Sequence, residues 1–165
     1  MTTNKVYFSI GSNIEPELHI KETIKQFKAD FFEAQISNIY RNPAIGFEGE
    51  DFLNLVICIE TEKSLSVMLK YANQLELAAG RERVSRGRFD SRTLDVDLIM
   101  FGDLSGTHHG RLWPDEDIDQ THVLRSLVDI AGDQFHPIKN ESYSDVWREV
   151  DKRDVKLTKV DFCKS

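Results

Sequence analysis

The stretch that decides the fold is Ser91-Arg92-Thr93-Leu94-Asp95-Val96-Asp97-Leu98-Ile99-Met100-Phe101-Gly102. Its alternation predicts a β-strand, because successive side chains of a strand point to opposite faces. One face would be fully apolar, formed by Leu94, Val96, Leu98 and Met100. The other face would begin with two carboxylates and continue with apolar side chains, in the order Asp95, Asp97, Ile99 and Phe101.

The two aspartates of this strand would stand about 7 Å apart, the spacing of alternate residues in an extended chain. Like charges at that spacing, beside an apolar surface, repel each other and lose hydration. Mg²⁺ prefers oxygen ligands and bridges phosphates, so the pair of Asp95 and Asp97 favours a magnesium–phosphate site. A half-exposed edge strand with solvated aspartates is the alternative that this pattern alone leaves open.

An arginine-rich run lies directly before the strand, from Arg81 to Arg92. It holds five of the ten arginines and no lysine, in a chain whose formal net charge is −7. A guanidinium group binds phosphate through two donors at once, which favours arginine where a polyphosphate is held. The run and the aspartates therefore predict one site, in which arginines bind phosphate oxygens and aspartates bind Mg²⁺. A solvated basic loop is the alternative.

Length and composition indicate one domain, residues 1–165, with a core over about 5–150 and a polar C-terminal tail. No apolar run approaches the roughly 20 residues of a membrane span, and the N-terminus has no signal-peptide core. Two isolated cysteines are typical of free thiols in a reducing compartment. A pI near 5.2 disfavours binding to nucleic acid or acidic membranes. We therefore expect a cytoplasmic monomer that acts on small molecules.

Hydrophobic periodicity predicts further strands over 6–10, 33–40 and 52–59, and helices over 17–29, 64–79, 119–131 and 144–150. We expect a turn at Gly11-Ser12-Asn13 and irregular chain over 103–117. The resulting β-α-β-β-α-β order predicts an α+β fold, a ferredoxin-like antiparallel sheet with helices packed on its faces. Within strand 52–59, the Asn54 amide is expected either to bond to neighbouring backbone or to recognise a ligand.

Several motifs occur together in one order along the chain. They are Gly11-Ser12-Asn13, Tyr40-Arg41-Asn42-Pro43, Phe52-Leu53-Asn54, Glu76 with Gly80-Arg81-Glu82-Arg83, and Arg92-Thr93-Leu94-Asp95-Val96-Asp97. From about Val6 to Pro137 the chain therefore resembles the 6-hydroxymethyl-7,8-dihydropterin pyrophosphokinases of folate biosynthesis. The resemblance implies a ferredoxin-like core and transfer of a pyrophosphoryl group from ATP to the pterin hydroxymethyl group, with release of AMP.

The resemblance also implies a role for individual residues. Asp95 and Asp97 match two aspartates that bridge two Mg²⁺ ions, and Arg81 and Arg92 match arginines that act on the transferring phosphates. The positions that match the ATP site are Glu76, Arg81, Arg83, Arg92, Leu98 and Arg111. Those that match the pterin pocket are Asn42, Pro43, Ile45, Phe52, Asn54 and His122.

The chain departs from the family pattern after the aspartate strand. A histidine and an aromatic residue that would contact ATP are replaced by Asp115 and Glu116, and His122 replaces a pocket phenylalanine. Acidic residues beside a triphosphate lower its affinity because like charges repel. A non-catalytic paralogue that binds a pterin or a nucleotide is therefore a second hypothesis. A magnesium-dependent nucleotidyltransferase is a third, and the position of Gly11-Ser12 far upstream of Asp95 argues against it.

Overall fold

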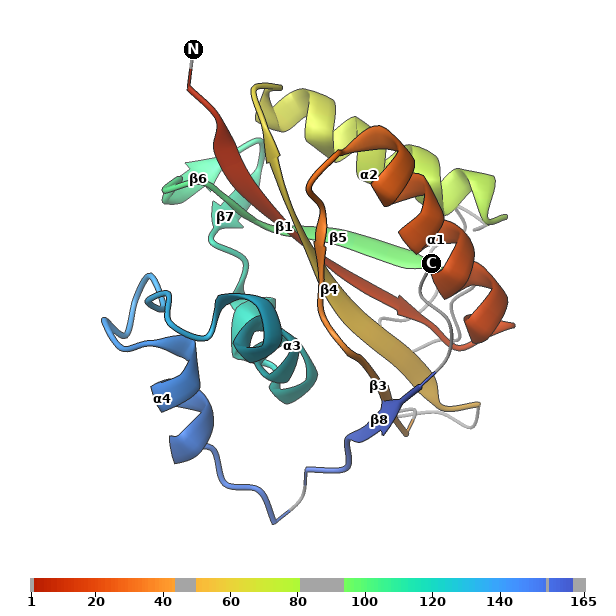
Figure 1. The fold of residues 1–165 in the computed structure, drawn as a ribbon. Helices are drawn as coiled ribbons and strands as arrows, with labels where there is room; N and C mark the ends of the chain where they lie inside the picture. The colour runs from red at the N-terminus through yellow and green to blue at the C-terminus, as the bar shows by residue number, and fades with distance from the viewer. Residues whose placement is uncertain (1, 44–49, 81–93, 154, 162–165) are drawn as a thin grey trace.

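The structure is a computed structural model that describes residues 2–43, 50–80, 94–153 and 155–161. Its main sheet is antiparallel, with the strand order β5-β1-β4-β3-β8 and the short β2 paired with β4 (Figure 1). The strands are β1 (Asn4–Ser12), β2 (Gln35–Ile36), β3 (Ile39–Asn42), β4 (Phe52–Thr61), β5 (Asp95–Phe101) and β8 (Thr158–Val160). The order of β5, β1, β4 and β3 is that of a ferredoxin-like sheet, so the predicted α+β fold is confirmed.

Helices cover both faces of this sheet, two on each (Figure 1). On one face lie α1 (Pro16–Asp30) and α2 (Leu65–Ala78), and on the other α3 (Thr121–Ala131) and α4 (Tyr143–Glu149). The alternation of β1 explains the two layers, since Phe8 packs with α1 and α2 while Tyr7 packs with α3 and α4. In the described part of the chain, no helix is long and apolar enough to cross a bilayer.

A β-bulge changes the predicted faces of β5. Tyr7 pairs with Met100 and Phe8 pairs with Leu98, so Ile99 is an extra residue on β5. An extra residue reverses the alternation beyond it. Met100 therefore joins Ile99 in the core under α3 and α4, and Phe101 packs toward α1 and α2, so the predicted faces of these two side chains were wrong. The aspartates precede the bulge and keep the predicted face.

Other boundaries also differ from the prediction. The expected turn at Gly11-Ser12 is the paired end of β1, and the single strand expected over 33–40 is broken into β2 and β3. The stretch expected to be irregular contains a hairpin of β6 (Gly106–His108) and β7 (Arg111–Trp113), followed by the 3₁₀ turn η1 (Glu116–Asp119). The polar tail contributes β8, which pairs with β3. Such pairings depend on distant partner strands, which local periodicity does not reveal.

Candidate active site

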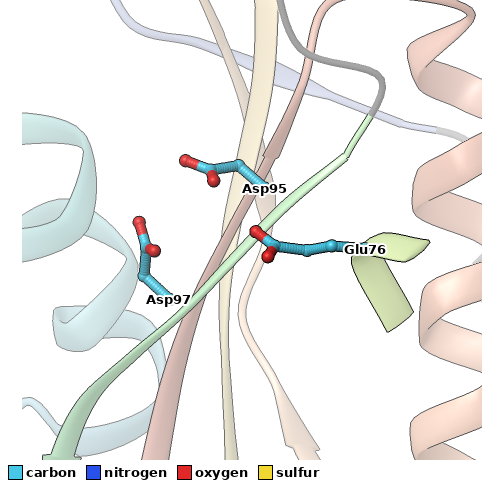
Figure 2. A group of neighbouring side chains, drawn as sticks. All are labelled: Glu76, Asp95 and Asp97. Atoms are coloured by element: carbon cyan, nitrogen blue, oxygen red, sulfur yellow. The ribbon is translucent and has the colours of Figure 1, made fainter. Parts of the chain in front are cut away.

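Three carboxylates meet at the start of β5. One oxygen each of Glu76, Asp95 and Asp97 lies within 4.8 Å of the other two. Figure 2 shows that the aspartates come from β5, while Glu76 reaches this strand from α2. All three side chains are half-buried. The aspartate pair predicted from the sequence is therefore joined by a third acid from another element.

Two features are relevant to the position of Glu76: the capped start of α2, on which it lies, and the edge position of β5 in the sheet. The Ser64 hydroxyl accepts a hydrogen bond from the Val67 N–H and caps the start of α2. In the described sheet, β5 lies at an edge and pairs with β1. Its Val96 N–H donates to Oε2 of Glu76 at 2.9 Å, so the glutamate protects the strand edge and holds its own carboxylate beside the aspartates.

The electrostatics of the cluster favour a cation. Burial, followed by the neighbouring charges of Asp95 and Glu76, raises the pKa of Asp97 from 3.8 to about 8. The charges of Asp117 and Asp115 make smaller contributions in the same direction. A hard divalent cation with oxygen ligands would stabilise the ionised carboxylates, and the close-set oxygens of the cluster fit Mg²⁺.

Asn54 lies on β4, and β1 separates it from the carboxylates. Gly11 of β1 pairs with Asn54 on one side and with Asp95 on the other. Nδ2 of Asn54 donates to Oδ1 of Asn42, so this amide bonds to another side chain rather than to neighbouring backbone. A Cβ atom at Gly11 would lie 2.7 Å from Oδ1 of Asn54. Glycine at position 11 thus leaves room for the hydrogen bond between Asn54 and Asn42. A turn was expected at Gly11, and this role was not predicted.

Arg111 is held by the segment that departs from the family pattern. Its Nη2 donates to the carbonyl of Leu98 at 3.0 Å and to Oδ2 of Asp115 at 2.8 Å. The guanidinium lies 4.7 Å from the ring centroid of Trp113. The other oxygen of Asp115 accepts the N–H of Asp117 and caps η1. Asp115 therefore links Arg111 to η1, which pattern reasoning did not foresee.

The other predicted site residues are placed as follows. The side chain of Leu98 is buried under α1 and α2, so only its carbonyl faces Arg111. Phe52 is half-buried and pairs with Asn42 across the ladder, and Pro43 is exposed after β3. His122 lies in the first turn of α3, where burial lowers the pKa of its imidazole to about 4. Outside the described residues lie Ile45, Arg81, Arg83 and Arg92.

Residues 7–132 match the family model of 7,8-dihydro-6-hydroxymethylpterin-pyrophosphokinase, abbreviated HPPK. The chain belongs to this family. The matched span includes the three carboxylates, the paired asparagines Asn42 and Asn54, and Arg111.

Curated relatives of the HPPK chain support the assignment. The chain is 27% identical to the Haemophilus influenzae 2-amino-4-hydroxy-6-hydroxymethyldihydropteridine pyrophosphokinase, over 79% of this chain and 84% of the relative. It is 33% identical to the Helicobacter pylori protein of the same name, over 60% of this chain and 63% of the relative. It is 25% identical to the Lactococcus lactis bifunctional protein FolKE, over 78% of this chain but only 38% of the relative.

A solved structure of Plasmodium falciparum HPPK-DHPS has a similar fold, with a TM-score of 0.62 at 10% identity. The alignment covers 88% of this chain and 43% of the Plasmodium chain. This HPPK chain therefore spans about two fifths of the length of the bifunctional relatives that it matches.

Proposed function

We propose that this HPPK chain transfers the pyrophosphoryl group of ATP to the hydroxymethyl group of 6-hydroxymethyl-7,8-dihydropterin and releases AMP. The observation that carries the proposal is the meeting of Glu76, Asp95 and Asp97 within 4.8 Å at an edge strand. Three neighbouring carboxylates would not be required to bind a neutral pterin, whereas they can bind the Mg²⁺ ions that accompany a triphosphate. The chain's family is named for a pyrophosphokinase reaction, and this geometry suits that reaction.

Asp95 and Asp97 would hold two Mg²⁺ ions, and Glu76 would orient the pair through its bond to the β5 edge. When bound, Mg²⁺ neutralises phosphate charge and lowers the pKa of a coordinated hydroxyl. The protein's own part is positioning, because phosphoryl transfer requires little covalent work from side chains.

The paired asparagines would recognise the pterin. Neighbouring strands lie about 4.8 Å apart, so Asn54 on β4 and Asp95 on β5 are separated by about 10 Å. That span suits a bicyclic pterin whose polar edge meets Asn54 and whose hydroxymethyl group reaches the carboxylates. We propose that the rest of this pocket is formed by Asn42, Pro43, Ile45, Phe52 and His122.

ATP would lie on the other side of the carboxylates, along the edge of β5. Arg111 already contacts that edge through the Leu98 carbonyl. Arg81 and Arg92 would neutralise charge on the phosphates as the bond between the α- and β-phosphates breaks, and Arg83 would contact the nucleotide. Glu76 and Leu98 complete this proposed ATP site.

The experiment measures AMP formed from ATP and Mg²⁺, with and without 6-hydroxymethyl-7,8-dihydropterin. Asp97→Ala should lower pterin-dependent AMP formation by at least about 10²-fold, since it removes a proposed ligand of the Mg²⁺ ions that would neutralise charge in the transition state. Asp103→Ala is the matched control, because Asp103 is an exposed acid just beyond β5. AMP formation that is unaffected by Asp97→Ala, or pterin binding by wild type without any AMP, would contradict the proposal.

The proposal includes a monomer of one domain that acts in the cytoplasm on small molecules, without nucleic acid or membrane partners. Light scattering on the purified chain tests the oligomeric state, with a mass near 19.0 kDa expected. A stable mass of twice that value would show that the protein is a dimer and contradict the proposed monomeric state.

A further inference from the structure

His136 is buried in the connection between α3 and α4, with 1% of its surface exposed. Its neighbours have a different environment, since Phe135 and Ile138 are exposed and line an open cavity of about 720 Å³ at the far end of β5. A polar ring buried between exposed neighbours requires partners of its own. Those partners connect this segment to the candidate active site.

The hydrogen bonds of His136 define which ring nitrogen carries the hydrogen. The N–H groups of Ile138 and Lys139 lie 3.1 Å and 3.2 Å from Nδ1. A backbone N–H can only donate, so Nδ1 accepts and the ring hydrogen is on Nε2. Nε2 lies 2.9 Å from Oδ1 of Asp119, to which it therefore donates.

Asp119 is the last residue of η1, and η1 begins beside Arg111 and β5. The first part of this turn is capped by Asp115, whose other oxygen binds Arg111. The N–H of Asp115 also donates to the carbonyl of Ile99 on β5. The backbone of η1 thus connects two sets of hydrogen bonds, that of His136 with Asp119 at its end and that of Asp115 with Arg111 at its start.

We propose that His136 is a positioning residue, which fixes η1 through Asp119 so that Asp115 orients Arg111 toward the nucleotide. The inference rests on the proposed function for the identity of the nucleotide, but the hydrogen bonds themselves do not depend on it. Since η1 is a single short turn, one bond from a buried ring at its end restricts its motion.

Substitutions of Asp119 are expected to disturb the fold less than those of His136, because the Asp119 side chain is about half exposed. Asp119→Ala removes the acceptor of the His136 bond, whereas Asp119→Asn keeps an oxygen acceptor there. His136→Asn keeps an acceptor near the Nδ1 position but is too short to reach Asp119. Lys139→Ala is the control for charge, since Lys139 also pairs with Asp119, at 3.7 Å near the surface.

Calorimetry would measure the affinity for MgATP in the absence of pterin. We expect Asp119→Ala and His136→Asn each to weaken binding about 3- to 10-fold, as for the loss of one ordinary hydrogen bond, because this bond acts on the nucleotide only through η1 and Arg111. The double variant should be no weaker than either single variant, because both remove the same bond. Asp119→Asn and Lys139→Ala should stay within about twofold of wild type.

Amide hydrogen exchange over residues 115–121 gives a readout that needs no nucleotide. Exchange there should accelerate in Asp119→Ala and not in Asp119→Asn, while β4 stays protected in both. Equal exchange and equal nucleotide affinity in these two variants would overturn the role of His136. A wild type that binds no MgATP would instead overturn the proposed function, and the exchange data would still decide on His136.

Discussion

Replacement of Asp97 by asparagine should stabilise the metal-free protein at pH 8, although it removes a proposed magnesium ligand. Burial and the charges of Asp95 and Glu76 raise the pKa of Asp97 from 3.8 to about 8. Between these values the folded protein holds a proton that the unfolded chain has released. The stability that depends on the protonation of Asp97 is therefore fully present below about pH 4. It falls progressively as the pH rises from there through the folded-state pKa of about 8.

The size of the effect follows from linkage. One proton difference changes the free energy of unfolding by at most about 1.4 kcal/mol for each pH unit. Asp97 is half-buried and shares its charge repulsion with Asp95, so we discount the full value and expect about 2 kcal/mol between pH 5 and pH 8. For a chain of 165 residues, that corresponds to a Tm difference of about 4–8 °C.

Thermal unfolding with a chelator present, from pH 5 to pH 8, measures this difference. Wild type should lose stability across the range, and Asp97→Asn should lose much less and exceed wild type at pH 8. Added Mg²⁺ should raise the Tm of wild type and leave Asp97→Asn unchanged, because a ligand stabilises the state that binds it. Parallel pH curves for the two proteins, or a less stable variant at pH 8, would show that the charge of Asp97 does not destabilise the folded protein.

Three further substitutions have defined outcomes. Gly11→Ala should weaken pterin binding by about tenfold in a fluorescence titration, since the added Cβ would stand 2.7 Å from Oδ1 of Asn54. Asp115→Asn keeps an acceptor for the cap of η1 but removes a charge bound to Arg111, so MgATP affinity measured at low salt should fall by at least threefold and the loss should shrink at high salt. Ser64→Ala should lower the free energy of unfolding by about 1 kcal/mol in urea, through loss of the α2 cap. An unchanged value in any of these measurements contradicts the contact on which it rests.

The sequence predicted those parts of the fold that depend on local pattern. The capped helix α2, the aspartate face of β5 and the order of strands and helices all follow from side-chain periodicity and from Ser64 as a cap. It did not predict the bulge at Ile99 or the pairing of β8 with β3, because both depend on the partner strand.

The candidate site shows the same division. Asp95 and Asp97 could be identified from one strand, but the contact of Glu76 with Val96 requires α2 and β5 to be packed together. The link from Asp115 to Arg111 joins a turn to a hairpin, and no spacing in the sequence indicates it. The residue types were therefore recognisable, while their hydrogen bonds required the fold.

Pyrophosphoryl transfer requires that two phosphoryl units move together from ATP to the pterin. ATP labelled at the β-phosphate with ³²P tests this directly, in the presence of Mg²⁺ and 6-hydroxymethyl-7,8-dihydropterin. The label should appear in the pterin product in an amount equal to the AMP released, and Asp97→Ala should abolish both. Label retained in ADP, or released as pyrophosphate or phosphate without a labelled pterin, would contradict pyrophosphoryl transfer to the pterin.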